Sequence, residues 1–344
     1  MHKLSVIFGL SGFSLTQKEK YFFKEVNPWA FILFKRNVLN KKQLIKLTSD
    51  LRQTLGRNCL IFIDQEGGRV QRLSSPNWQI YPSGSFYNDL YSVDKGMALR
   101  SAYLAYSMIA DDLRECGITA NCAPVLDIPV EGADPIISDR AYGKNPSQVI
   151  DIANAVMSGL MSGGVVPVIK HIPGHGRARV DSHKKLPIIP TKLQTLRNSD
   201  FIPFQALKDA PMAMTAHAVY ECSSKSPLTI SRKSFDTLIR KEIGYTGLVM
   251  SDDLDMKALS GDLIDRTRAS LNAGCDIALQ CSGNLESMNN VAKGAKTLDG
   301  ISLNRATIAE YCSDIFDCID REGFKNELNS LIAFHHKYFE MNRD

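Results

Sequence analysis

Short, continuous apolar runs recur along the chain, and this feature limits the possible folds more than any other. Eight such runs can be distinguished. They cover residues 4–8, 30–34, 60–63, 118–122, 165–169, 212–215, 248–250 and 277–279. Runs this short that lack polar alternation are typical of strands buried on both faces of a parallel sheet. The sequence therefore predicts eight buried strands.

Longer segments with helical periodicity lie between the runs, including residues 41–55, 94–116, 146–161, 191–208 and 263–273. Alternation of strand and helix indicates a parallel sheet. Because no linker rich in Gly, Ser or Pro divides the chain, we expect one α/β domain over residues 1–344, a single (β/α)₈ TIM-type barrel. Two or three further helical segments after residue 279, including 301–319 and 325–338, are expected to close the barrel or pack beside it.

A doubly wound open sheet is the alternative fold. Its dinucleotide-binding members carry a GxGxxG turn after the first strand, and the first predicted strand here lacks that turn. A dinucleotide site therefore has little support, and we expect no cofactor.

The charge balance limits the possible partners. The 344 residues include 41 Lys and Arg against 37 Asp and Glu, which gives a formal net charge of +4. This balance, without a long basic run, argues against a nucleic-acid partner and leaves room for a mildly acidic small-molecule substrate. We expect a monomer.

Cysteine use and hydropathy bear on the cellular location. The eight cysteines show no CxxC spacing, and several lie in apolar runs, as buried reduced thiols do. No apolar stretch approaches the ~20 residues that a membrane-spanning helix needs. Residues 1–10 faintly resemble a signal peptide, but their apolar run is short and lacks a small-residue cleavage site. We therefore expect a cytoplasmic protein without a membrane partner.

Polar residues stand directly after several of the predicted strands. Asp64 follows residues 60–63, Lys170 and His171 follow 165–169, and Asp252 closely follows 248–250. His217 closely follows another run. Any one of these side chains could simply satisfy backbone groups. Because a barrel builds its active site at the C-terminal ends of its strands, the group predicts a site on that rim.

The segment of residues 170–183 concentrates histidines on an irregular loop rich in glycine. Asp181 and His183 are two residues apart, so the carboxylate can hold one imidazole nitrogen while the other faces a substrate. This spacing predicts an acid/base dyad, although a surface Asx turn with an idle histidine would look the same. The glycines also suggest that the loop closes on substrate, so His183 need not lie beside its catalytic partner in a ligand-free protein.

A metal site is the competing interpretation of this loop. His171, His175, Asp181 and His183 are all residue types that bind zinc. However, an HxxxH spacing on a glycine-rich loop fixes no ligand geometry, so we expect no metal.

Two adjacent carboxylates follow the seventh run. Strand alternation should point Asp252 and Asp253 in different directions, so only one can readily serve the pocket. Asp252 is the better candidate, while Asp253 is expected to cap the next segment or bind a backbone amide. A carboxylate beside an acid/base group suits glycosyl transfer through a covalent intermediate.

Several further polar residues could bind a polar ligand. Asp64 and Arg72 flank a glycine-containing loop, and Arg140 and Lys170 add hydrogen-bond donors. Surface salt bridges are the alternative interpretation of each arginine.

These residues lie in motifs that resemble glycoside hydrolase family 3, in particular its single-barrel bacterial β-N-acetylglucosaminidases of the NagZ type. The strongest motif is Lys-His-x-Pro-Gly-His-Gly at 170–176, followed after four residues by Asp-Ser-His at 181–183 and by Leu-Pro at 186–187. Other matching stretches are residues 64–72, 123–127, 138–140 and 251–256. Ile172 replaces a phenylalanine that is frequent in this family, a change that affects packing more than chemistry.

The resemblance implies a retaining exo-glycosidase in which Asp252 is the nucleophile and His183, paired with Asp181, is the general acid/base. It implies that N-acetylglucosamine is bound by Asp64, Arg72, Arg140, Lys170 and His171. It also implies a substrate class: N-acetylglucosamine-containing muropeptides and anhydro-muropeptides of cell-wall recycling. The rival hypotheses are a metal-dependent hydrolase and a carbohydrate-binding barrel without catalytic activity.

Overall fold

The computed structural model describes residues 2–342, so the ends of the predicted 1–344 domain lie outside the described residues. Eight parallel strands form a closed barrel in the order β1-β2-β3-β6-β7-β9-β11-β12, and β12 pairs with β1. These strands are β1 (Leu4–Gly9), β2 (Pro28–Leu33), β3 (Ile61–Ile63), β6 (Ala120–Asn121), β7 (Val166–Ile172), β9 (Met212–Thr215), β11 (Leu248–Asp253) and β12 (Ile277–Gln280). Each of the eight predicted runs contributes one barrel strand, so the predicted barrel is confirmed.

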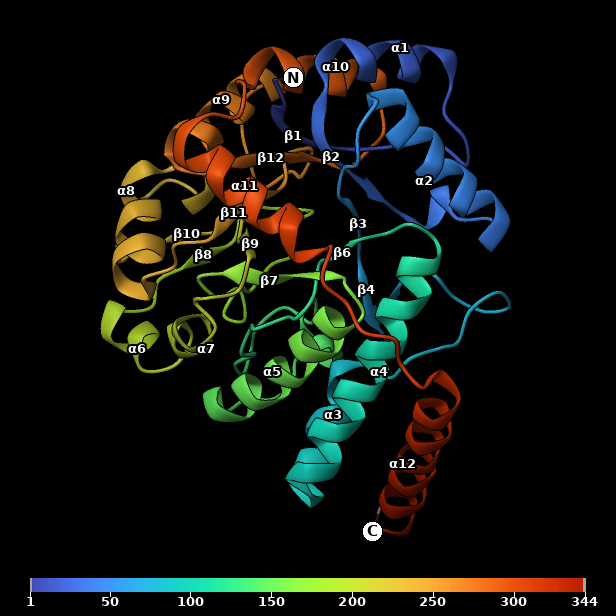
Figure 1. Cartoon of the computed structure of the whole chain (residues 1–344). Coiled ribbons are helices and arrows are strands. Elements are labelled where there is room, and N and C mark those ends of the chain that lie inside the picture. Colours follow the sequence, from blue (N-terminus) through green and yellow to red (C-terminus); the bar gives the residue numbers. More distant parts are fainter. Residues whose placement is uncertain (1, 343–344) are drawn as a thin grey trace.

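Helices surround the strands as an outer ring (Figure 1). The helices are α1 (Gln17–Val26), α2 (Lys41–Leu55), α3 (Gly84–Val93), α4 (Lys95–Glu115), α5 (Pro146–Ser162), α6 (Leu193–Arg197), α7 (Phe201–Ala206), α8 (Arg232–Ser234), the π-helix η4 (Phe235–Ile243), α9 (Leu263–Ala273), α10 (Leu285–Gly294), α11 (Gly300–Cys312) and α12 (Arg321–Met341). Three 3₁₀ turns are η1 (Lys35–Asn37), η2 (Ser138–Arg140) and η3 (Leu228–Ile230). Outside the barrel, β4 (Gln65–Gly67) pairs with β5 (Val70–Gln71), and β8 (Ile188–Ile189) pairs with β10 (Val219–Tyr220).

Two predicted helices differ from the structure. The segment 191–208 forms two short helices, α6 and α7, because the chain turns at Asp200, whose buried carboxylate accepts a hydrogen bond from Arg177 Nε at 2.8 Å. Pro203 then lies in the first turn of α7, where a missing N–H costs nothing. The segment 301–319 is helical only as far as Cys312.

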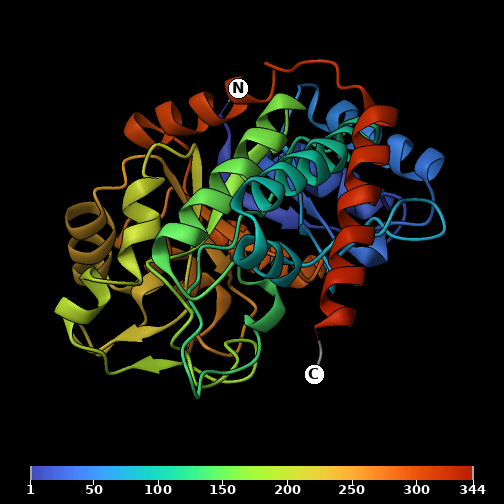
Figure 2. The same cartoon turned by 90° about the horizontal axis from the view of Figure 1, so that it is seen from below.

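Two helices near the C-terminus complete the fold in different ways. Ala306 and Ala309 of α11 belong to the same buried cluster as Trp29 and Leu60 at the beginnings of the strands, so α11 closes the N-terminal end of the barrel. In contrast, α12 lies outside the barrel and packs against α4 (Figure 1 and Figure 2). These segments were expected to close the barrel or pack beside it; α11 does the first and α12 does the second.

Among residues 2–342, no helix combines the length and the apolar character that crossing a membrane requires.

Candidate active site

Most of the predicted site residues line one cavity at the C-terminal ends of the strands. The cavity has a volume of about 250 Å³. Its walls include seven of the eight predicted residues: Asp64, Arg72, Arg140, Lys170, His171, His183 and Asp252. The eighth residue, Asp181, reaches the cavity through its hydrogen bond to His183. His217 does not line the cavity.

The turn after β3 shapes one wall. Asp64 directly follows β3, and the next residues fold back as the β4–β5 hairpin. Gly67 and Gly68 both have positive φ, and a Cβ on Gly67 would lie 2.1 Å from the carbonyl oxygen of Pro82. Only glycine fits this turn, which brings Arg72 back to Asp64, with 3.2 Å between Nη2 and Oδ2.

Two buried carboxylates hold the cations of this wall. Lys170 is 2% exposed and donates to Asp64 Oδ1 at 2.9 Å, and its Nζ lies 2.7 Å from Glu66 Oε1. Arg140 donates two bonds of 2.8 Å to Glu66. Burial raises the pKa of Glu66, but Arg140 and Lys170 lower it more, to about 2. Burial also raises the pKa of Asp64, and Lys170 and Arg72 hold it well below its usual range. All these groups are charged at neutral pH.

Arg72 keeps an open donor in this network. Its Nε is buried and has no hydrogen-bond partner among the described residues. Because an unpaired buried donor is costly, this atom is available to an oxygen of a bound ligand.

His171 is oriented from behind by Asp127. Asp127 Oδ2 lies 2.6 Å from His171 Nδ1, and Oδ1 accepts from the backbone amides of His171 at 3.3 Å and His175 at 2.6 Å. Burial raises the pKa of Asp127, but His171 and His175 lower it more, to about 2. An ionised carboxylate accepts only, so Nδ1 carries a proton and Nε2 is the nitrogen left for the cavity.

Asp252 lies at the end of β11, where the barrel fixes its backbone. Its amide donates to Thr215 Oγ1 at 3.3 Å, and its Oδ1 accepts from the Asp253 amide at 2.8 Å. Burial raises the pKa of Asp252, but His217, His171 and the Asp253 amide lower it more. An ionised, anchored carboxylate with one uncommitted oxygen is suited to nucleophilic attack.

Asp253 has a different environment from its neighbour. Its Oδ1 accepts from the amides of Asp255 at 3.1 Å and Cys281 at 3.0 Å. The prediction that Asp253 binds a backbone amide is therefore confirmed. Burial, followed by the charge of Asp255, raises the pKa of Asp253 to about 7. The pKa values of two adjacent aspartates are thus shifted in opposite directions because their surroundings differ.

The Asp181–His183 pair combines the two interpretations of its spacing. Asp181 Oδ1 accepts from the backbone amide of His183 at 2.9 Å, which is an Asx turn, and lies 2.8 Å from Nδ1 of the same residue. Burial raises the pKa of Asp181, but its bonds with His183 lower it more. His183 is 65% exposed and lines the same cavity as Asp252, and its Nε2 has no hydrogen-bond partner within residues 2–342. The loop therefore places the pair at the cavity that Asp252 lines.

The four residues of the metal hypothesis have separate partners. His171 is held by Asp127, and His183 is held by Asp181. Burial lowers the pKa of His175 to about 4, so its ring is neutral. Across residues 2–342, no group of three or more His, Cys, Asp or Glu is arranged to hold a metal ion.

Comparison with known proteins supports the family expected from the motifs. A family model described as "Glycosyl hydrolase family 3 N terminal domain" matches residues 8–315. The chain belongs to this family. The match covers seven of the eight barrel strands in full, the end of β1 and every predicted site residue.

Relatives of this family 3 chain include curated proteins and solved structures. A protein named Beta-hexosaminidase from Bordetella avium is 34% identical over 281 residues, which cover 80% of each chain. Another of that name from Alkalilimnicola ehrlichii is 35% identical over the same share of both chains. The structure of native NagZ from Neisseria gonorrhoeae has a TM-score of 0.86 and 29% identity, covering 96% of this chain and 98% of that one. NagZ from the same organism was also solved in complex with N-trifluoroacetyl-D-glucosamine, with a TM-score of 0.86.

Two buried carboxylates of this family 3 site, Glu66 and Asp127, were not among the predicted site residues. Both act through other side chains, Glu66 on Arg140 and Lys170, and Asp127 on His171. Asp127 follows Val125-Leu126 and precedes Ile128, so a charge inside an apolar stretch was the available signal. A buried carboxylate needs a partner, and the partners here are the residues that line the cavity.

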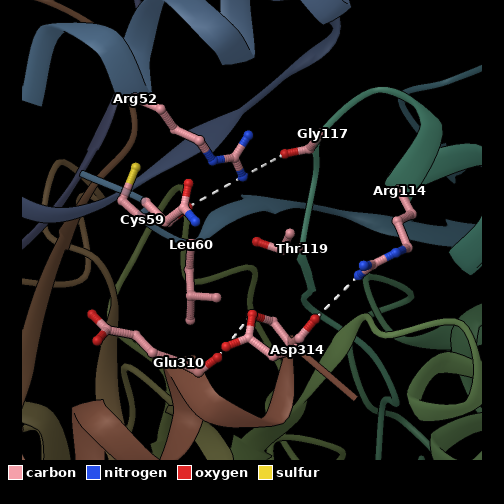
Figure 3. Close-up of a pocket in the computed structure, with 10 residues that line it drawn as sticks. Arg52, Cys59, Leu60, Arg114, Gly117, Thr119, Glu310 and Asp314 are labelled. Atoms are coloured by element: carbon pink, nitrogen blue, oxygen red, sulfur yellow. Dashed lines mark hydrogen bonds between the residues drawn. The ribbon is translucent and has the colours of Figure 1, made fainter. Parts of the chain in front are cut away.

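A larger cavity of about 510 Å³ lies at the opposite, N-terminal end of the barrel. Arg52 and Arg114 reach into it from two sides, as Figure 3 shows. Arg52 Nη2 donates to the carbonyl oxygens of Gly117 at 2.8 Å and Cys59 at 3.2 Å, and Arg114 Nη1 donates to that of Ser313 at 3.1 Å. These arginines bind loop backbone rather than carboxylates. In barrel enzymes this face serves stability, whereas the catalytic residues lie at the other face.

Proposed function

We propose that this family 3 glycosidase is a retaining exo-β-N-acetylglucosaminidase that removes terminal β-linked N-acetylglucosamine from peptidoglycan fragments in cytoplasmic cell-wall recycling. The proposal rests on one observation: Asp252, whose pKa is lowered, and His183, whose Nε2 is available, line the same small cavity. The residues Asp64, Arg72, Arg140 and Lys170, which we call the charged wall, line that cavity too. The names of the relatives and the glucosamine derivative bound to the Neisseria protein favour the same sugar.

The first chemical step needs a nucleophile and an acid on opposite sides of the glycosidic bond. Asp252 attacks the anomeric carbon with the oxygen that the Asp253 amide leaves free. His183 Nε2 gives its proton to the glycosidic oxygen, and the aglycone departs as an alcohol. The product is a glycosyl-enzyme on Asp252.

The second step reverses the proton transfer. His183, now neutral, takes a proton from a water molecule that attacks the anomeric carbon, and Asp252 is released as a carboxylate. Asp181 stays hydrogen-bonded to Nδ1 throughout, so the ring keeps its orientation while Nε2 changes protonation. Two inversions give net retention.

The cavity also suits an exo-acting enzyme. A volume of about 250 Å³ holds a single sugar ring. The charged wall offers donors from Lys170, Arg72 and Arg140 and acceptors from Asp64 to the ring hydroxyls and the acetamido group. The chain works as a monomer in this proposal, because all named groups come from one chain.

His183→Ala provides the sharpest test of the two-step mechanism. An activated aryl β-N-acetylglucosaminide needs no protonation to leave, so glycosylation of Asp252 should stay fast while the water step becomes slow. The glycosyl-enzyme should then accumulate and appear by mass spectrometry on the peptide that contains Asp252. Added azide should restore turnover and give a β-glycosyl azide, because an anion needs no general base.

Controls separate this result from damage to the loop. Lys185→Ala changes an exposed residue of the same loop and should behave like wild type. Asp252→Asn should form no adduct. An α-configured azide product, or no release of aryl group by the wild-type protein, would contradict the proposal.

A further inference from the structure

Asp127 is a fully buried carboxylate that does not line the cavity yet uses both of its oxygens on the segment that carries the site residues. It lies in the segment after β6, next to β7, where Leu126 N donates to Lys170 O at 2.7 Å. A buried charge is tolerated only where it is fully paired. The question is what this pairing does for the site.

One oxygen of Asp127 fixes a sugar-binding residue. Its Oδ2 lies 2.6 Å from His171 Nδ1, a short bond typical of a charge-assisted pair. The bond holds the ring plane and places the proton on Nδ1, so Nε2 faces the cavity as an acceptor when the ring is neutral.

The other oxygen holds the beginning of the loop that carries His183. Asp127 Oδ1 accepts from the amide of His175 at 2.6 Å. The following residues continue the contact, since Val130 N donates to Gly176 O at 3.2 Å and Asp134 N donates to Ala178 O at 2.7 Å. Residues 175–178, the loop stem, therefore lie flat against residues 127–134.

Gly176 makes this close packing possible. A Cβ at this position would lie 2.0 Å from the carbonyl oxygen of Ile128, a distance that no side chain can adopt. Beyond Ala178, the Asp181–His183 pair bonds within the loop itself, and the chain is next held at Pro187, whose carbonyl accepts from Val219. The acid/base pair thus lies on a tip whose stem is anchored at Asp127.

We propose that Asp127 is a positioning residue with two separable roles: it fixes the ring and tautomer of the sugar-binding His171, and it anchors the stem of the loop that carries His183. The proposal rests on the glycosidase function above. It goes beyond that function because it links sugar binding and acid catalysis through one carboxylate outside the cavity.

Three variants separate the two roles. In Asp127→Asn, Oδ1 still accepts from both amides, but Nδ2 donates to His171 Nδ1 and moves the ring proton to Nε2. In Gly176→Ala, the pairing with His171 remains but the stem is lifted from Ile128. Asp127→Ala removes both contacts. Asp134→Asn is the matched control, because it makes the same chemical change on the same segment and its Oδ1 only accepts from Ile136 N.

Kinetics with two aryl β-N-acetylglucosaminides, one with a good and one with a poor leaving group, give the readout. Asp127→Asn should raise KM about tenfold for both substrates, the loss of one charge-assisted bond in orientation. Gly176→Ala should leave KM near wild type and lower kcat about a hundredfold for the poor leaving group only, because only that substrate needs His183 correctly placed. Asp127→Ala should show both defects.

Two measurements do not depend on turnover. The ¹⁵N shifts of His171 should report a proton on Nδ1 in wild type and on Nε2 in Asp127→Asn. Brief trypsin treatment should cut this loop in wild type only beyond the stem, after the exposed residues Arg179, Lys184 or Lys185. In Gly176→Ala and Asp127→Ala it should also cut after Arg177.

The outcomes distinguish this inference from the proposed function. A wild-type protein inactive on both substrates would remove the function, while the tautomer and trypsin results would still decide the roles of Asp127. An active wild type with unchanged KM in Asp127→Asn would overturn the His171 role. Equal kcat losses on both substrates in Gly176→Ala, or an uncut stem, would overturn the anchoring role.

Discussion

Two cations at the C-terminal end of the barrel and two arginines at its N-terminal end differ in their hydrogen-bond partners. At the C-terminal end, Arg140 and Lys170 pair with the carboxylate of Glu66 around a cavity of about 250 Å³. At the N-terminal end, Arg52 and Arg114 donate to backbone carbonyls of the loops that lead into the strands (Figure 3).

The difference indicates what each end can do. A guanidinium that donates to loop carbonyls satisfies backbone groups and holds the loop. It is not paired with a carboxylate that could help it to orient a substrate. Cations held between buried carboxylates stay charged, ordered and ready to donate to a ligand. We therefore expect substitutions at the C-terminal end to change activity and those at the N-terminal end to change stability.

The largest expected effect is on catalysis. Asp252→Asn keeps the shape of the side chain and removes its nucleophilicity, so kcat should fall at least ~10⁴-fold. The melting temperature should change little, since the Asn can still accept from the Asp253 amide. Steady-state kinetics and thermal unfolding of the same samples check this. A loss of activity matched by a loss of folded protein would place Asp252 on the structural side of the comparison.

Lys170→Met should lower both activity and stability, because this site residue is also deeply buried. Its removal leaves Asp64 and Glu66 each with one cation fewer, which should cost about 3–5 kcal/mol of unfolding free energy as well as substrate binding. Urea unfolding measures the cost. Lys3→Met is the control at the other end, because Lys3 pairs with Glu310 at a partly buried position that solvent still reaches, and its loss should cost about 1 kcal/mol.

The barrel itself could be predicted because a strand covered on both faces must be apolar at successive positions, and each of the eight runs satisfied this requirement. The break between α6 and α7 was missed because helical periodicity is continuous across it. Pro203 was the local signal, since it has no N–H for a continuous helix and fits the first turn of a new one. The contact of Arg177 with Asp200 at this turn joins residues 23 positions apart and leaves no local pattern.

The site residues that face the cavity could be predicted because the ends of parallel strands meet, so position along the chain indicated position in space. Asp127 lacks that signal, since it does not line the cavity and holds another side chain. Glu66 does line the cavity, but it lies in the β4–β5 hairpin rather than directly after a barrel strand. Distances between atoms also resolved a choice that the spacing in the sequence left open. The Asp181–His183 separation allowed either an Asx turn or a dyad, and one carboxylate oxygen serves both.

Arg52 and Arg72 offer a matched pair with one arginine at each end. Arg52→Met should lower the unfolding free energy by about 1–3 kcal/mol, because two loop carbonyls lose their donor, and kcat/KM should stay within about twofold of wild type. Arg72→Met should raise KM at least ~10-fold with a stability change under ~1 kcal/mol, since Arg72 has one pair at 3.2 Å and an unused Nε. Urea unfolding and kinetics of both variants would refute the comparison if the two patterns were exchanged.

The smallest expected effect concerns Asp253, a residue of the C-terminal end that we assign to structure. Its folded-state pKa of about 7 lies above the usual value of 3.8, so the folded protein binds a proton that the unfolded chain has released. Stability from this group is therefore present at low pH and is lost as pH rises through 7, by roughly 1 kcal/mol between pH 6 and 7.

Asp253→Asn keeps an oxygen for the Asp255 and Cys281 amides and cannot ionise, so this part of the pH dependence should disappear. Urea unfolding at pH 5, 6, 7 and 8 compares the two proteins. Because Glu66 and Asp127 have lowered pKa values, their stabilisation is lost only as pH falls from about 4.5 toward about 2, outside this window. If the stability difference between wild type and Asp253→Asn instead stays constant from pH 5 to pH 8, Asp253 is already ionised when folded, and it belongs with the charged residues that serve the substrate.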